Sequence, residues 1–155
     1  MSEKKAVKTV MNAKLREKMR GFLPMEKDAV YEFTFEEFKD IEEDEFKPIF
    51  SIRQFTKEET ILIKRLVAES YRLVEESKTN NKKKKEAALK QIKENDLKQC
   101  KLSLDVVLGW RNLYFLSTSE ELKECVYSEE NKKRFTDNMI GEILAEALKI
   151  TGFLS

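Results

Sequence analysis

The chain contains no histidine, and this absence excludes much of the common catalytic and metal-binding chemistry. Without an imidazole there is no Ser-His-Asp triad, no Cys-His pair, no histidine metal ligand and no histidine pH switch. Two cysteines, Cys100 and Cys125, are too few for a zinc site or a disulfide framework. We therefore expect no metal and no cofactor, and a reducing, cytoplasmic compartment.

Glycine and proline are also scarce. The four glycines stand singly at positions 21, 109, 141 and 152, so the sequence has no glycine-rich phosphate loop. No apolar run approaches the ~20 residues that a membrane helix needs. The first residues, Met1-Ser-Glu-Lys-Lys, lack the apolar region of a signal peptide. The sequence thus gives no positive support to enzyme function and predicts no contact with a membrane.

Hydrophobic residues make up 41% of the 155 residues, and ten phenylalanines supply material for a core. Few Gly and Pro, with abundant Lys, Glu, Leu and Ala, favour helices over a β-sandwich. We predict a mainly α fold, a compact domain of about four to five helices with a small β-hairpin or short strands near residues 29–54. This single domain is expected to span residues 25–155, and residues 1–24 are expected to form a separate basic helix.

Charge is nearly balanced over the whole chain, at +1, but it is strongly segregated along it. Residues 1–25 carry seven basic groups against two acidic ones, and residues 78–101 carry nine against three. Between them, residues 26–47 carry ten acidic groups against three basic ones. These segments are candidate partner-facing surfaces, whereas the balanced total gives no general drive towards nucleic acid.

The opening segment, from about Lys4 to Arg20, has the pattern of a basic amphipathic helix. Its apolar residues recur at spacings of three and four, and Gly21 and Pro24 follow where the helix should end. Such a short helix with so little to bury is marginal alone, so it either docks on the body of the protein or lies in a partner's groove. Its apolar stripe consists of Val7, Val10, Met11, Leu15 and Met19.

Further along, local patterns predict a strand and then a long helix. Alternation over Phe50 and Ile52 indicates a short, half-buried strand. Thr56 and Glu59 have the spacing of a capping box for a helix that runs to about Ser77. A wide apolar stripe on this helix predicts that it faces the core. The stripe consists of Ile61, Leu62, Ile63, Leu66, Val67, Tyr71, Leu73 and Val74.

Residues 79–85 form a polar, lysine-rich break that we predict to be a solvated loop. A second long helix is expected from about Lys84 to Leu108, ended by Gly109. Its predicted apolar face consists of Leu89, Ile92, Leu97, Cys100, Leu104, Val107 and Leu108.

After this helix comes a dense apolar cluster that begins at Trp110 and is expected to lie outside any long helix. Ser128 predicts the start of a short helical turn, and Thr136 or Asp137 the start of a last helix that ends at Gly152.

The pairs of adjacent acidic residues and the two cysteines are more typical of a structural role than of catalysis or metal binding. Neighbouring carboxylates such as Glu129 and Glu130 point apart, and residues 42–45 lack the turn glycine of a calcium loop, so we expect a solvated acidic surface. Cys100 and Cys125 are expected to be unreactive. The Lys82–Lys85 run lacks the aromatic residues that stack on bases, so we expect it to be solvated.

Three pieces of the sequence share an order and spacing with one known family. They are Pro48-Ile-Phe-Ser-Ile-Arg-Gln-Phe-Thr-Lys-Glu-Glu59, Leu108-Gly-Trp-Arg-Asn-Leu113 and Val126-Tyr-Ser-Glu-Glu-Asn131. They resemble elements of the tail assembly chaperones and related small tail-gene products of long-tailed bacteriophages, and the resemblance extends over residues 49–63 and 108–150. The chain departs from the family between Tyr114 and Glu124, where members often have an acidic glycine turn, and residues 4–20 match nothing in it.

The resemblance implies a non-enzymatic helical protein of the infected bacterial cell, which covers the tape-measure protein and helps to recruit tube subunits. Phage tail proteins are then the expected partners, self-association is left open, and neither nucleic acid nor membrane is expected. For Trp110 the alternative to an interaction role is plain core packing. The expected protein-interaction residues are Trp110, Leu113, Tyr114, Phe115 and Leu116, with Val7, Met11 and Leu15 of the first helix.

Two other functions fit the same sequence. One is a structural tail, neck or baseplate adaptor that stays in the finished particle. The other is a small nucleic-acid-associated regulator that uses the two basic segments.

Overall fold

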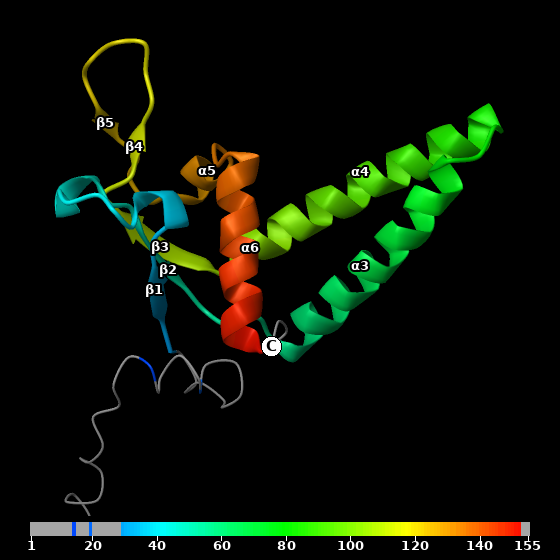
Figure 1. Cartoon of the computed structure of the whole chain (residues 1–155), viewed down its shortest axis with the longest axis horizontal. Helices are drawn as coiled ribbons and strands as arrows, with labels where there is room; N and C mark the ends of the chain where they lie inside the picture. Colours follow the sequence, from blue (N-terminus) through cyan, green and yellow to red (C-terminus); the bar gives the residue numbers. More distant parts are fainter. Residues whose placement is uncertain (1–13, 15–18, 20–28, 153–155) are drawn as a thin grey trace, which may run out of the picture.

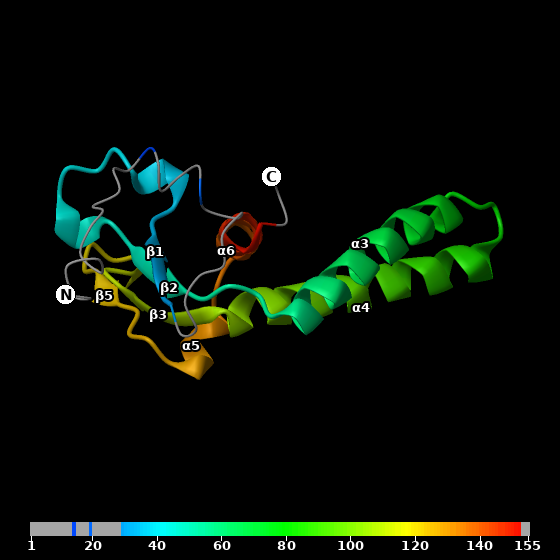
Figure 2. The same ribbon diagram turned by 90° about the horizontal axis from the view of Figure 1, so that it is seen from below.

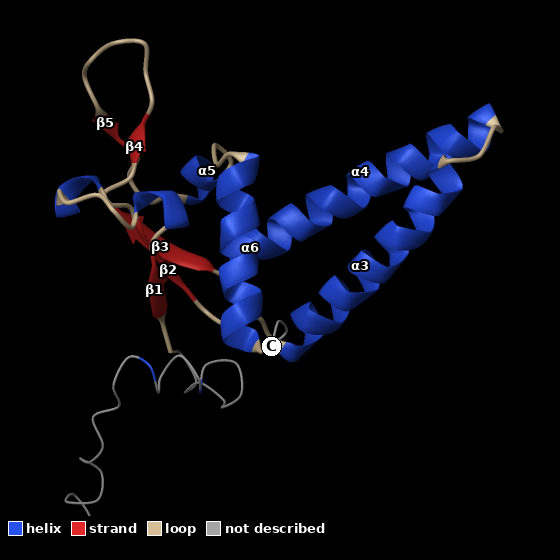
Figure 3. Cartoon of the chain, in the orientation of Figure 1, coloured by secondary structure: helices blue, strands red, loops and turns tan. Residues whose placement is uncertain are grey.

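The computed structural model describes residues 29–152, together with Lys14 and Met19. Helix dominates this part of the chain, as predicted, and the strands are gathered at one end of the molecule (Figure 3). The elements in chain order are β1 (Tyr31–Phe33), η1 (Glu36–Phe38), η2 (Asp44–Phe46), β2 (Ile49–Ile52), α3 (Lys57–Ser77), α4 (Lys82–Asp105), β3 (Val107–Arg111), β4 (Tyr114–Phe115), β5 (Lys123–Glu124), α5 (Glu129–Lys132) and α6 (Asp137–Thr151).

Strands β1, β2 and β3 form an antiparallel sheet in that order, and β4 pairs separately with β5. The strand predicted over Phe50 and Ile52 is confirmed, and both side chains are fully buried. Phe50 lies opposite Phe33 of β1 and Trp110 of β3. The predicted small β element near residues 29–54 is therefore present, but it takes its third strand from a distant part of the chain.

The second long helix ends earlier than its sequence pattern predicts. α4 stops at Asp105, and the residues that follow Val106 belong to β3. Gly109 is therefore not a helix cap, because it lies opposite Ser51 in the sheet. Val106 and Val107 are buried in the core, and β-branched residues suit such a pleated, covered setting better than a frayed helix end.

The prediction of a lysine-rich loop before α4 is wrong, because Lys82–Lys85 form the first turn of that helix. The Asn81 side chain caps α4 by accepting a hydrogen bond from the Lys84 backbone N–H at 3.2 Å. Only residues 78–81 connect α3 to α4, which is enough for two antiparallel helices.

The predicted caps of α3, α5 and α6 are confirmed. Thr56 Oγ1 accepts from the Glu59 N–H at 3.1 Å, and Glu59 Oε1 accepts from the Thr56 N–H at 2.8 Å, which completes the capping box of α3. Ser128 caps α5, and Thr136 rather than Asp137 caps α6. At the far end of α6, Gly152 has a left-handed φ of 90°, a conformation that glycine adopts without strain.

The α3–α4 hairpin extends away from the rest of the molecule (Figures 1 and 2). α3 accordingly buries only Ile63, Leu66 and Leu73, so the wide core-facing stripe predicted for it is wrong. α4 buries Ala88, Asn95, Leu102 and Ser103. Of the predicted face, Leu104 packs against the core, whereas Leu89 and Leu97 are exposed. Away from the body of the protein the two helices have only each other to pack against. The exposed large apolar residues of the hairpin are therefore Ile61, Val67, Tyr71, Val74, Leu89 and Leu97.

The core lies where the first sheet, the base of the hairpin and α6 meet. Phe50 is at its centre, with ring centroids 4.7 Å from Phe35 and 5.8 Å from Phe135. α6 lies between the sheet and the hairpin (Figure 1) and joins the two. The side chains that α6 buries are Ile143, Ala147, Leu148 and Ile150.

The predicted helix of residues 4–20 and the domain boundary after residue 24 lie outside the described residues, apart from Lys14 and Met19. The same holds for Val7, Met11 and Leu15, which were expected to contact a partner. Among the described helices, none has the length and apolar character needed to cross a membrane.

Candidate protein-binding site

Trp110, the first of the predicted interaction residues, is built into the packing of β3. Its half-buried ring lies 4.9 Å from the ring of Tyr127 and 4.9 Å from that of Phe135, measured between centroids. Its Nε1–H donates to the Cys125 carbonyl oxygen at 2.6 Å, as a covered indole usually requires. This is the packing role that was the alternative for Trp110 on sequence grounds.

The four residues after it do not share one face. Leu113 and Tyr114 line a groove beside the start of α6. Phe115 is half-buried under the Arg134 guanidinium, whose carbon lies 5.0 Å from the ring centroid. Leu116 is 97% exposed in the loop between β4 and β5. The structure thus divides the predicted cluster among core, groove and solvent.

A more continuous apolar surface lies on α3. Val67, Tyr71 and Val74 recur at helical spacing along one side of the helix, and their exposed fractions are 38%, 75% and 44%. With Ser70 of the same helix and two residues of α4, they line a shallow groove of about 300 Å³. We call this the arm groove.

A second groove of about 360 Å³ lies between α4 and α6, and we call it the crossing groove. Asp96 and Gln99 of α4 line both grooves, so the two are neighbours on either side of these residues. The crossing groove is lined by Lys93, Asp96, Leu97, Gln99, Cys100, Ser103, Asp137, Ile140, Gly141 and Leu144.

The linings of the two grooves mix apolar and polar side chains. Val67, Tyr71 and Val74 line the arm groove, Ile140 and Leu144 line the crossing groove, and the polar Asp96 and Gln99 stand where the two meet. Partly apolar, partly polar surfaces of this kind are common at transient protein interfaces.

Gly141 lies in the wall of the crossing groove and is the fifth residue of the 15 in α6. A glycine inside a helix costs about 1 kcal/mol relative to alanine. A Cβ atom built at Gly141 would meet no atom within 4 Å, so no neighbour in the described structure requires a glycine there. Its missing side chain keeps the groove open, which is useful only if something else enters it.

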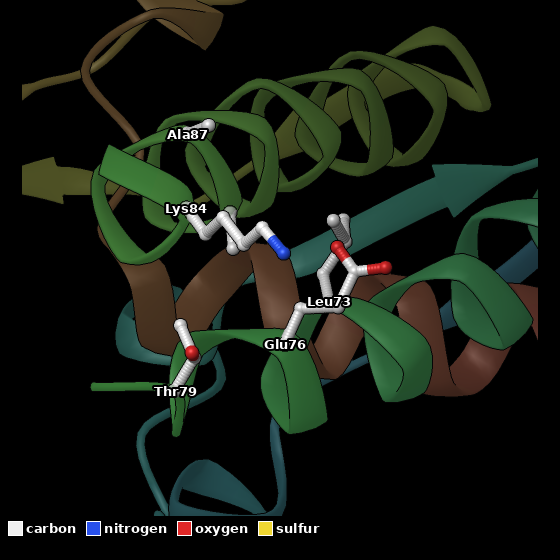
Figure 4. A pocket seen from close by; sticks show the side chains of 6 residues that line it. Leu73, Glu76, Thr79, Lys84 and Ala87 are labelled. Carbon is white, nitrogen blue, oxygen red and sulfur yellow. The ribbon is translucent and has the colours of Figure 1, made fainter. Parts of the chain in front are cut away.

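A third hollow of about 610 Å³ lies near the tip of the hairpin (Figure 4). Leu73 and Ala88 are its buried apolar residues, while the exposed Glu76 and Lys84 point into it from α3 and α4. Glu76 is already ion-paired with Arg72. These polar groups belong to the solvated surface of the hairpin, and we assign them no chemistry.

Within residues 29–152 no three His, Cys, Asp or Glu side chains converge to hold a metal ion. Burial raises the pKa of the Cys100 thiol and that of the Cys125 thiol. Both cysteines are therefore poor nucleophiles at neutral pH, in agreement with the prediction of unreactive thiols. The carboxylates of residues 42–45 are exposed, as predicted.

Sequence reasoning missed the arm groove because an apolar stripe has the same pattern whether the core or another protein covers it. Gly141 carried a usable signal, since an isolated glycine inside a strong helical pattern usually has a packing or functional reason.

Comparisons of the chain with protein-family models, with curated proteins and with solved structures find no match.

Proposed function

We propose that this protein is a tail assembly chaperone of a long-tailed bacteriophage or prophage, and that it holds a helical segment of its client along α3, α4 and α6. The observation that carries the proposal is the pair of neighbouring grooves, with the exposed side chains of Val67, Tyr71 and Val74 in the wall of the arm groove. The sequence resemblance supplies the class of client, namely the tape-measure protein and the tube subunits.

The grooves suit a helical client. An amphipathic helix presents apolar side chains at intervals of three and four residues, and a groove with matching anchors binds it along that face. Val67, Tyr71 and Val74 have this spacing, and Gly141 leaves room for a side chain from the client. Charges of both signs at Lys93 and Asp96 can meet charged flanks of either sign on the client.

A chaperone must also release its client. The grooves are shallow and their apolar anchors are few, so most of the binding free energy rests on a small number of side chains. The exposed Tyr71 is the strongest anchor of the three because its ring is large and rigid.

Binding to a tape-measure protein, taken from the gene that the proposal predicts downstream, tests the proposal. The double variant Tyr71→Glu/Val74→Glu changes exposed residues, so the fold is kept, and we expect the affinity for the client to fall about tenfold or more. Ile61→Glu is the matched control, because Ile61 is an exposed apolar residue of the same helix that lines neither groove. It should change the affinity less than about twofold.

Equal binding by the two variants would exclude the grooves as the client site. Mass spectrometry of finished particles should not find a chaperone; its presence there would instead identify a structural adaptor. Salt-sensitive retention on nucleic acid would identify a regulator. The proposal also predicts a tube-protein gene upstream and a very long tape-measure gene downstream.

A further inference from the structure

A groove of about 510 Å³ lies between η1, the turn that follows β3 and the start of α6, apart from the two grooves described above. Three aromatic residues line it together with the carboxylates of Glu37 and Glu142, and no lysine or arginine belongs to its lining. We call it the aromatic groove. Its apolar lining consists of Phe35, Phe38, Pro48, Leu113, Tyr114 and Met139.

The negative charge of the aromatic groove is not balanced by a cation within the described residues. Glu142 Oε1 accepts a hydrogen bond from the Glu36 backbone N–H at 3.3 Å. Neither Glu37 nor Glu142 forms an ion pair with a described cation, and Lys39 is paired with Glu36 instead. The exposed acids of residues 42–45 follow on the same segment and add to the negative charge.

Aromatic rings and carboxylates in one groove favour the same kind of occupant. The faces of aromatic rings attract a cation, and a carboxylate beside them pairs with it. The apolar lining meanwhile suits the aliphatic stem that carries the ammonium group of a lysine. The chemistry of the groove therefore fits a lysine side chain better than an uncharged one.

The opposite charge is concentrated at the end of the α3–α4 hairpin, in residues 78–85, which we call the hairpin tip. Residues 78–93 carry seven basic groups against one acidic group. Lys78 pairs with Glu75, but among the described residues no acid forms an ion pair with any of the exposed Lys82–Lys85.

The secondary structure makes this concentration of lysines unfavourable in the isolated chain. Lys82–Lys85 form the first turn of α4, where the helix end itself is partly positive. Like charges one turn apart on a helix also repel one another. Glu76 faces the tip from α3 but is paired with Arg72 (Figure 4). A negatively charged surface on another molecule would relieve this repulsion.

A second copy of the chain supplies that surface. The hairpin tip and the sheet lie at opposite ends of the molecule (Figures 1 and 2), so the tip lysines cannot reach the groove of their own chain. Residues 26–47, which include part of the groove wall, carry ten acidic groups against three basic ones. The charges of the two ends are therefore complementary between copies.

We infer that the aromatic groove is the docking site for the hairpin tip of a second copy of this chain, which places a lysine against its rings and carboxylates. Because the contact joins two different surfaces, each copy keeps one free tip or one free groove, and further copies can add in the same way. This inference is independent of the proposed function, because it uses neither the arm groove nor the crossing groove.

Sedimentation velocity of the full-length chain tests the inference. At low ionic strength the weight-average sedimentation coefficient should rise with protein concentration, and about 1 M salt should return it to that of the monomer. The double variant Glu37→Lys/Glu142→Lys should raise the dissociation constant about tenfold or more. Glu120→Lys/Glu121→Lys is the matched control, with the same change of charge in the β4–β5 loop outside the groove. It should change the dissociation constant less than about twofold.

A charge swap between two chains gives a stricter readout. Lys82→Glu/Lys83→Glu should abolish association, while acidic residues in the first turn of a helix favour the fold. An equimolar mixture of this variant with Glu37→Lys/Glu142→Lys should associate again, although neither does so alone. Circular dichroism of each variant shows that the fold is kept.

Three results would overturn the inference. One is a natural chain that stays monomeric at millimolar concentration and low salt. Another is association that the groove and tip variants leave intact. The third is association that Tyr71→Glu/Val74→Glu abolishes, which would assign the contact between copies to the arm groove instead.

Discussion

Arg53, just after β2, forms a two-point ion pair with Glu59, the third residue of α3: Nη1 lies 2.7 Å from Oε1 and Nη2 lies 3.1 Å from Oε2. The same guanidinium donates to the carbonyl oxygen of Asp105, the last residue of α4, at 3.4 Å. The planar fork of arginine suits this double contact with a carboxylate. One side chain thus joins the sheet to both helices of the hairpin at its base.

The ion pair between Arg53 and Glu59 makes the free energy of unfolding depend on pH. Burial alone would raise the pKa of Glu59, but the hydrogen bonds from Arg53 and from the Thr56 backbone hold it below its ordinary value. A carboxyl whose pKa is lowered in the folded state stabilises the fold above its unfolded-state pKa of about 4.3. That contribution is lost as the pH falls through the lower, folded-state pKa.

The first prediction is that Glu59→Gln lowers the free energy of unfolding by about 1 kcal/mol at pH 7. The difference from the natural chain should shrink as the pH falls through the lowered pKa of Glu59, where the carboxyl itself becomes protonated. Urea unfolding followed by circular dichroism, at pH 7 and over a series of acid pH values, measures it. Glu58→Gln, in the same exposed first turn, is the control; an equal loss in that variant would assign the effect to the helix dipole instead of to Arg53.

A second prediction concerns Trp110. Trp110→Ala removes a ring packed on Phe50, Tyr127 and Phe135 and leaves the Cys125 carbonyl without its donor. We expect a loss of about 3–5 kcal/mol in the free energy of unfolding, a large share of the stability of a domain this size. Thermal unfolding by circular dichroism measures the loss.

The contrasting variant is Leu116→Ala, which changes a side chain that is 97% exposed. It should alter stability by less than about 0.5 kcal/mol. If Trp110→Ala changes the free energy of unfolding as little as Leu116→Ala does, Trp110 is not a packing residue. An interaction role for Trp110 would then be the better explanation.

The third prediction follows from Asn95, which is 1% exposed between α3 and α4. Its Oδ1 accepts from Gln91 Nε2 at 3.0 Å, but its Nδ2 has no hydrogen-bond partner. Leucine branches at the same carbon as asparagine and needs no partner, so Asn95→Leu should raise the free energy of unfolding by about 1 kcal/mol. Asn95→Ala should lower it, because it leaves a cavity. A loss of stability in the leucine variant would show that the amide is satisfied in solution.

A fourth prediction compares two glycines of α6: Gly141 within the helix and Gly152 at its C-terminal cap. Gly141→Ala should raise the free energy of unfolding by about 0.5–1 kcal/mol, since the added methyl group meets no atom within 4 Å. This corresponds to a rise of about 1–4 °C in Tm. Gly152→Ala should lower Tm, because the left-handed φ of 90° strains a residue with a Cβ atom. Differential scanning calorimetry distinguishes the two, and a lower Tm for Gly141→Ala would mean that this position is tightly packed.

Local signals in the sequence predicted the ends of elements well. Thr56, Ser128, Thr136 and Gly152 act through hydrogen bonds or backbone conformations within a few residues, so their neighbours in the sequence contain the whole cause. The strand around Phe50 was predictable for the same reason, since its alternation shows on a single short segment.

Features that depend on distant parts of the chain could not be predicted in this way. Val107 and Gly109 continue the apolar pattern of α4, and only pairing with β2 turns them into a strand. Likewise, nothing near Tyr71 shows that α3 extends beyond the body of the protein. The candidate grooves are formed by α3, α4 and α6 together, so Val67 and Gly141 become part of one surface only through the fold.

Because the hairpin extends from the body of the protein, it also separates two groups of opposite charge along the long axis. The lysines at the start of α4 lie at one end of the long axis, and the acidic residues around η2 lie at the other (Figure 1). Among the described residues, this separation contributes an electric dipole moment along the length of the molecule. Near a highly charged assembly, that contribution produces a torque before contact and favours end-on encounters.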